Sequence, residues 1–105
     1  MKKISHIAIS RKVNALLEIG KSKRDIADSL EKSVIFVEQC KALKKLSPKV
    51  KKWVDNGLKY FDAYRLVVLP HDQQEIFAQK IMEKGFEIIK EELKRVKIEL
   101  KQNLA

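Results

Sequence analysis

The chain has 105 residues, enough for one domain, and an apolar content of 45%, enough for a modest hydrophobic core. Its formal net charge of +9 favours a polyanionic partner, and its single cysteine excludes a disulfide framework. Because it shows neither an apolar run near the roughly 20 residues of a membrane span nor a signal-peptide core, we expect a cytoplasmic protein without membrane contact.

The positive charge is concentrated in the first half of the chain. Residues 1–57 carry 14 basic and 6 acidic side chains, whereas residues 58–105 carry 9 and 8. A positive field confined to one region suits a phosphate backbone, because counterion release there supplies most of the sequence-independent affinity. The alternative is a basic surface that serves solubility alone.

Helical periodicity runs through the chain and no strand pattern occurs, so we expect an all-α, compact multi-helix domain. A first helix is expected over 9–19, ended by Gly20 in a left-handed C-cap. Ser22 is expected to cap a second helix over 23–30, with Asp25 in the acidic position of a capping box.

Residues 24–43 predict a helix-turn-helix, because two short helical patterns meet there across a tight turn. Ser33 is the expected N-cap of the second helix, over 34–46. Glu31 stands where such turns usually have glycine and is expected at positive φ, at a cost of about 1 kcal/mol. The residues expected to face inward are Ile26, Ala27, Leu30, Val37 and Cys40, the cysteine as buried filler.

Three further helices are expected before the last segment. The first is expected to start at Ser47-Pro48 and to end at Gly57. The second is expected over 60–70, where Pro70 stops it. The third is expected to start with Asp72 as its cap and to end at Gly85. We expect Trp53 in the core. Arg65 has two possible partners, a phosphate or a carboxylate.

The last segment, 86–105, predicts a long amphipathic helix. Its apolar residues step alternately by three and four, the order of a coiled-coil seam. Two outcomes are open, since so short a seam can also fold back on its own domain of residues 1–85. We favour a homodimer, with the interface residues Ile89, Leu93, Val96 and Leu100.

No pattern that carries enzyme chemistry is found. His6 and His71 have no Cys or His at ligand spacing, and the sequence contains no Gly-rich phosphate loop and no Ser or Cys placed near a His in a nucleophilic arrangement. The adjacent Glu91 and Glu92 belong to a charged helix. We therefore expect no enzyme, no metal and no cofactor.

Several stretches between Lys12 and Gly85 stand in a definite order. These are LLEIG, KSKRDIADSLEKS, LKKLSPKVKKWVDNG and DAYRLVVLPHDQQEIFAQKIMEKG. This order resembles the central DNA-binding domain of the ParB and KorB partition proteins: a scaffold helix ending in glycine, an I/V-A pair and K-S before the recognition helix, a proline-containing helix, and an Ala-x-Arg helix before a Q-x-x-x-A-x-K-I helix. The family's N-terminal CTP-binding domain has no counterpart in the sequence, so clamp-like spreading along DNA is not implied. Its separate C-terminal dimerisation domain has none either, unless the helix over 86–105 replaces it.

The resemblance implies an all-helical domain that places its second motif helix in the major groove of a palindromic site as a homodimer. Plasmid or phage partition, transcriptional repression and DNA transfer are the implied roles. The family's base-facing positions fall on Ser33, Val34, Ile35, Glu38, Gln39 and Ala42. Gln39 suits adenine, Glu38 a cytosine amine, and the apolar side chains a thymine methyl.

A basic frame surrounds this helix and is expected to contact phosphates from both ends. It consists of Lys21, Lys23, Arg24 and Lys32 before the helix, and of Lys41, Lys44, Lys45, Lys49, Lys51 and Lys52 within or after it. With the six base-facing residues, the predicted DNA contacts are Lys21, Ser22, Lys23, Arg24, Lys32, Lys45 and Lys49, thirteen residues in all. The frame favours double-stranded DNA over RNA, because RNA modules stack bases on exposed aromatics and the seven aromatics here are mostly at core spacing.

A protein-binding or inhibitory module on the same scaffold is the alternative hypothesis. Three of the base-facing positions are apolar and one is acidic, and Val34 and Ile35 would form an apolar contact patch. The basic frame argues for DNA, because a protein-binding face has little use for it.

Overall fold

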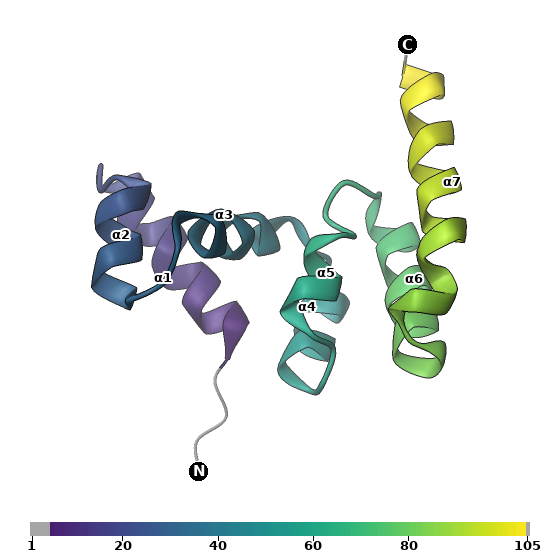
Figure 1. Cartoon of the computed structure of the whole chain (residues 1–105), viewed down its shortest axis with the longest axis horizontal. Helices are drawn as coiled ribbons and strands as arrows, with labels where there is room; N and C mark the ends of the chain where they lie inside the picture. Colours follow the sequence, from purple (N-terminus) through teal and green to yellow (C-terminus); the bar gives the residue numbers. More distant parts are fainter. Residues whose placement is uncertain (1–4, 105) are drawn as a thin grey trace.

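The computed structural model describes residues 5–104, and the side chains of residues 5–102 (Figure 1). Residues 1–4 of the predicted domain 1–85 and Ala105 of the predicted segment 86–105 lie outside the described residues. The elements are α1 (His6–Glu18), α2 (Lys23–Leu30), α3 (Val34–Ala42), the 3₁₀-helix η1 (Leu43–Lys45), α4 (Pro48–Asp55), α5 (Tyr60–Tyr64), α6 (His71–Lys84) and α7 (Phe86–Leu104). No strand occurs within the described range, so the all-α prediction is confirmed.

The helix starts follow local capping chemistry. A serine hydroxyl accepts a hydrogen bond of 3.1 Å from the backbone N–H three residues later at each of the three predicted N-caps, Ser22, Ser33 and Ser47. Gly20, with φ +94°, follows α1 in the left-handed region as predicted. Ser5 caps α1 in the same way, so this helix begins three residues before the expected start.

The expected helix over 34–46 is in fact shorter. It is α-helical to Ala42 and then tightens into η1, since Leu46 is extended (ψ 151°) and Ser47 already caps the next helix. Ser47, the residue before Pro48, is extended as well (ψ 155°), which is the conformation that a following proline favours.

The expected helix over 60–70 was also wrong in length. α5 ends at Tyr64, and the chain continues to Leu69 in turns closed by bonds to the third residue back. The β-branched pair Val67-Val68 is a poor continuation of a helix. Asp72 is not the cap of α6: Pro70 occupies that position and Asp72 lies in the first turn, where its charge favours the helix dipole.

Two hydrophobic clusters hold the helices together. The smaller closes the helix-turn-helix and consists of Val13, Ile26, Ala27, Val37 and Cys40, each at most 2% exposed. Leu30 packs at its edge. The predicted inward face of the motif is thereby confirmed. Burial raises the pKa of the Cys40 thiol to about 11, which suits a packing residue.

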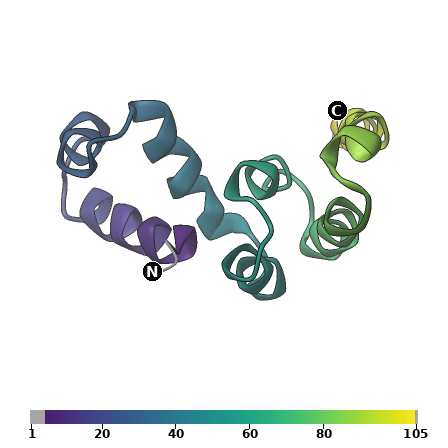
Figure 2. The same cartoon turned by 60° about the horizontal axis from the view of Figure 1, so that its bottom comes forward.

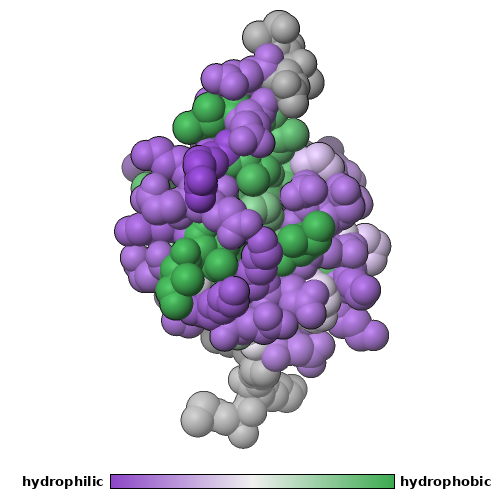
Figure 3. Space-filling model, turned by 90° about the vertical axis from the view of Figure 1, so that its right-hand side faces the viewer, coloured by the Kyte–Doolittle hydropathy of each residue, from purple (hydrophilic) through white to green (hydrophobic). Residues whose placement is uncertain are grey.

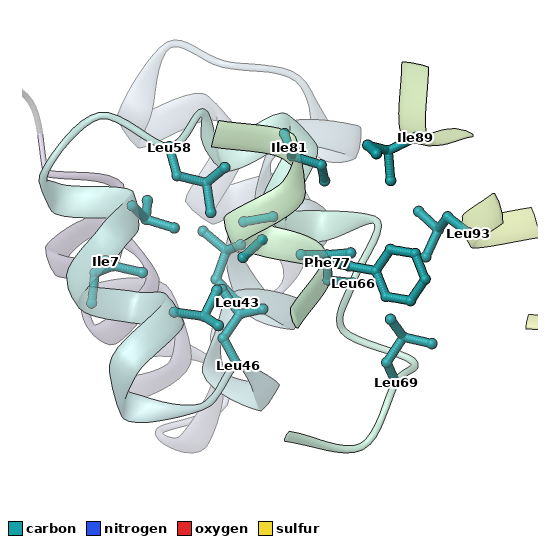
Figure 4. Close-up of a cluster of buried hydrophobic side chains, with 14 residues drawn as sticks. Ile7, Leu43, Leu46, Leu58, Leu66, Leu69, Phe77, Ile81, Ile89 and Leu93 are labelled. Atoms are coloured by element: carbon teal, nitrogen blue, oxygen red, sulfur yellow. The ribbon is translucent and has the colours of Figure 1, made fainter. Parts of the chain in front are cut away.

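The larger cluster joins η1 and the helices α4 to α7, and it includes Ile89 and Leu93 of α7 (Figure 4). Each is 3% exposed, and Figure 4 shows both side chains directed toward Phe77 and Ile81 of α6. This corrects their assignment to a dimer interface: the apolar stripe of α7 covers its own domain, because α6 offers the complementary apolar face. Val96 and Leu100 are half-buried against the same cluster.

Gln74 connects the end of η1 to α6. Its side chain is fully buried; Oε1 accepts a hydrogen bond of 2.8 Å from the backbone N–H of Ser47, and Nε2 donates to the carbonyls of Leu69 (3.0 Å) and Lys45 (3.2 Å). Such a satisfied buried amide fixes where three chain segments meet. It therefore holds the helix-turn-helix half in place on the C-terminal helices.

Glu31 adopts the predicted left-handed conformation, φ 56°, ψ 42°, and is the only residue other than glycine with positive φ in the described range. The turn is closed by the N–H of Lys32, which donates to the carbonyl of Ala27 at 2.9 Å.

We expect Glu31→Gly to raise the free energy of unfolding by about 0.5–1 kcal/mol, because glycine adopts this conformation without the steric cost. Urea denaturation measures the effect. The matched control is Asp28→Gly at an exposed helical position of α2, which should lower stability by about 1 kcal/mol. Equal losses from both variants would contradict strain at Glu31.

Candidate nucleic-acid interface

α3 lies across the middle of the N-terminal half, from the α2 side to α4 and α5 (Figure 2). It packs on α1 and α2 through Val37 and Cys40, and on α5, where the ring of Phe36 meets Tyr60 edge-on. The opposite side is open: Ile35 is 67% exposed, and Val34, Glu38 and Lys41 are exposed as well. The motif thus presents one helix face to solvent, which is how a helix-turn-helix offers its second helix to a groove.

The thirteen predicted contact residues divide by exposure. Ten are exposed, namely Lys21, Ser22, Arg24, Lys32, Ser33, Val34, Ile35, Glu38, Lys45 and Lys49, and three are half-buried, namely Lys23, Gln39 and Ala42. Lys41 was named only as part of the frame, yet it lies on the exposed face of α3, three residues from Glu38. The helical spacing alone was sufficient to place it there.

Glu38 does not stand alone on this face. Its Oε1 lies 3.0 Å from Nζ of Lys23 on α2, in an ion pair between half-exposed side chains. The pair is worth little in stability, on the order of 0.2–1 kcal/mol, but it offsets the one acidic charge of α3 and ties the two motif helices together across the turn. The sequence reasoning missed this partner, since it depends on how α2 and α3 cross.

Two lysines of the frame lie over aromatic rings. Nζ of Lys32 is 5.5 Å from the ring centroid of Phe36, and Nζ of Lys49 is 6.0 Å from that of Trp53. Trp53 itself is half-buried and packs on the larger cluster, as expected. Both lysine side chains are exposed, so these contacts pre-position the charges beside α3.

A hollow of about 470 Å³ opens on one flank of α3. Its walls come from α1, the motif turn, α3 and α5, and include His6, Ile35, Gln39 and Tyr60. Gln39 was expected to point outward, but it is half-buried beside this hollow and not in the middle of the exposed face. The imidazole of His6 stacks on Tyr60, with centroids 4.1 Å apart, and meets Phe36 edge-on at 6.3 Å.

The environment of His6 predicts a pH dependence. Burial, followed by the nearby Lys32 charge, lowers the pKa of His6 below 6.5, against the opposite influence of Asp55. The unfolded chain therefore binds this proton more readily, and stability should fall as the pH drops from 6.5 through the lower folded pKa. His6→Phe keeps the stack on Tyr60 but has no proton to bind.

We expect the urea midpoint of the wild-type chain to fall more between pH 7.5 and pH 5.5 than that of His6→Phe. The other titratable groups are common to both proteins and cancel in this difference. Parallel pH profiles would show that the folded structure does not perturb His6.

Together the geometry defines an all-α protein that presents the second helix of a helix-turn-helix within a basic frame. Within residues 5–104, no helix has the length and apolar character needed to cross a bilayer. The same range contains no group of three or more His, Cys, Asp and Glu side chains arranged to hold a metal ion. Comparison with protein-family models, curated proteins and solved structures finds no match to this chain.

Proposed function

We propose that this protein binds double-stranded DNA at specific sites, with α3 in the major groove. The observation that carries the proposal is the exposed face of α3, whose single carboxylate is paired with Lys23 and whose surroundings are basic. Because Lys23 offsets the charge of Glu38, this face repels phosphates less than an unpaired carboxylate would.

The residues divide into two roles. Lys41 and Lys45 on the exposed side of α3 and η1, with the lysines and Arg24 around the turn, contact phosphates. The Ser33 oxygen accepts the capping bond from Phe36, so its hydroxyl proton is free to donate to a phosphate. Val34, Ile35 and Ala42 meet thymine methyls, and Gln39 reads adenine from the flank.

A homodimer on a palindromic site belongs to the same proposal, in partition, transcriptional repression or DNA transfer. With Ile89 and Leu93 inside the domain, two copies must meet through other surfaces. Sedimentation of the intact chain, alone and with a palindromic duplex, measures the mass. A single copy bound at saturating protein would remove the dimer from the proposal.

The deciding experiment is a binding titration at rising salt. It compares DNA duplexes from the region upstream of the protein's own gene with duplexes of random sequence. We expect log K to fall linearly with log salt, with a slope that counts the phosphates contacted, and a tighter complex with one upstream site. Affinity that does not depend on salt, or does not exceed that of random duplex, would refute sequence-specific DNA binding.

One observation favours the alternative of a protein-binding face. Ile35 is 67% exposed and forms one wall of the 470 Å³ hollow, so an apolar side chain of a partner protein has a place to insert. Ile35→Ser distinguishes the two functions: it should change sequence preference modestly in a DNA reader and abolish binding of a protein partner.

A further inference from the structure

A second surface, far from α3 in the fold, has its own chemistry. An apolar groove of about 750 Å³ runs along α7 and is closed on its other side by the α5–α6 connection. Its apolar walls include Val68, 68% exposed, and Ile98, 47% exposed, together with Phe86 and Leu100. Figure 3 shows apolar surface between hydrophilic side chains on the side of the molecule that α7 occupies. The C-terminal half of α7 extends beyond α6, which leaves this side uncovered (Figure 1).

The rim of the groove is almost entirely basic. Lys90, Lys94, Lys97 and Lys101 follow one another on α7 at spacings of four, three and four residues, so they form one row beside the apolar stripe. Glu91 is the one acidic residue among the lining residues. Although the C-terminal half of the chain is nearly neutral, its charges are thus separated by face.

Most of these cations have no acidic partner within the described side chains. Lys90 pairs with the exposed Glu87 at 3.1 Å, but Lys94, Lys97, Lys101 and Arg65 form no ion pair there. Lys97 is half-buried, and burial together with the charge of Arg65 lowers its pKa. An anion placed beside Lys97 would favour its charged form and so act against both effects.

Arg65 lines the same groove and lies near Phe86 and Lys97. No carboxylate pairs with it among the described side chains, and its guanidinium lies over the rings of Phe61 and Phe86, 4.8 and 4.2 Å from their centroids. Contact with two rings restrains the guanidinium, whose N–H donors lie at the groove.

We propose that this groove binds an acidic amphipathic helix of a partner protein. The partner's apolar residues would enter between Val68 and Ile98, and its carboxylates would face the lysine row and Arg65. The row from Lys90 to Lys101 corresponds to about three helical turns, roughly 17 Å, which sets the length of the segment that fits.

The basic rim and the apolar walls of the groove together exclude the two simplest other occupants, a second copy of the chain and duplex DNA. A second copy would bring the same basic rim against this one, since an isologous contact joins identical surfaces, and juxtaposed like charges cost several kcal/mol. Duplex DNA would match the lysines but would leave the apolar walls of Val68 and Ile98 unoccupied, because phosphates and sugars do not enter an apolar groove. An acidic helix with an apolar stripe satisfies both halves of the surface.

The probe is a synthetic amphipathic helix of about four turns, with leucines at i, i+3, i+4 and i+7 and glutamates on its other face. Its binding to the full chain is measured by fluorescence anisotropy and mapped by backbone amide shifts. Two control peptides have lysine in place of glutamate, or the same composition in scrambled order. We expect the acidic helix alone to bind and to shift amides along α7 and residues 65–68.

Variants then test the site. Lys94→Glu/Lys101→Glu, at exposed positions, should weaken peptide binding by about tenfold or more, and Ile98→Ser should weaken it without changing the charge. Arg95→Glu/Lys84→Glu makes the same change in net charge outside the groove and should leave the affinity within about twofold. Circular dichroism confirms that each variant is folded.

Several outcomes would overturn the proposal: equal binding of the acidic and scrambled peptides, no binding of the acidic one, amide shifts outside the groove, or equal losses from the two charge-reversal pairs. Self-association that shifts the groove amides would assign the surface to a second copy, and shifts there on adding duplex would assign it to DNA. The groove and the exposed face of α3 are separate surfaces, so the proposal is independent of DNA binding by α3. Lys41→Glu/Lys45→Glu should therefore leave peptide binding unchanged.

Discussion

Gln74→Leu should lower the free energy of unfolding by roughly 2–5 kcal/mol. Leucine has a similar volume but cannot replace the three hydrogen bonds that Gln74 makes to the backbone of Ser47, Leu69 and Lys45. The Gln74 side chain is fully buried, so water cannot reach the groups left without a partner. A loss of this size is a large fraction of the stability of a small domain. Urea denaturation followed by circular dichroism measures it.

Two further variants sharpen this test. Gln79→Leu, on the exposed side of the same helix, should change stability by no more than about 0.5 kcal/mol. Gln74→Glu places a carboxyl oxygen opposite two carbonyls, so only its protonated form fits and its folded pKa should be raised. Its stability should therefore be highest below the unfolded glutamate pKa of about 4.3 and should fall as the pH rises. If Gln74→Leu cost no more than Gln79→Leu, the hydrogen bonds of Gln74 would not hold the two halves together.

Lys41→Glu/Lys45→Glu should weaken binding to every DNA duplex by about a hundredfold or more at low salt and reduce the salt slope by about two. Both side chains are exposed, on α3 and on η1, and each is expected to contribute one phosphate contact. Gln39→Ala should instead relax the preference among sequences and leave the salt slope unchanged, because an amide that reads a base releases no counterion. Anisotropy titrations against specific and random duplexes at several salt concentrations separate the two effects.

The matched control is Lys94→Glu/Lys101→Glu on α7, which changes the net charge equally but lies on the groove. Its effect on DNA affinity should be no more than a few-fold, through long-range electrostatics alone. Equal losses from the two pairs would mean that DNA responds to the total charge and not to α3. Equal, uniform losses from Lys41→Glu/Lys45→Glu and Gln39→Ala would show that Gln39 reads no base.

Local chemistry explains what could be predicted about the candidate site. The N-cap at Ser33 and the positive φ of Glu31 depend on residues no more than five positions apart, so their signals are complete in a short stretch of sequence. The inward face of the motif followed from the helical period, and Ile26 and Val37 are buried accordingly. The pairing of Lys23 with Glu38 and the sideways position of Gln39 could not be found in this way, because both depend on the crossing of helices.

The sequence by itself determined the all-α fold, the starts of α2, α3 and α4, and the turn between the motif helices, because each depends on backbone hydrogen bonds and caps within a few residues. Only the tertiary structure decided where the apolar stripe of α7 packs. Its three-and-four apolar spacing suits a second copy and its own α6 equally well, and the choice depends on whether Phe77 and Ile81 present a complementary face. With Ile89 and Leu93 occupied there, the lysine row and the groove beside it face solvent, and a charge pattern that looks ordinary in sequence becomes a second surface.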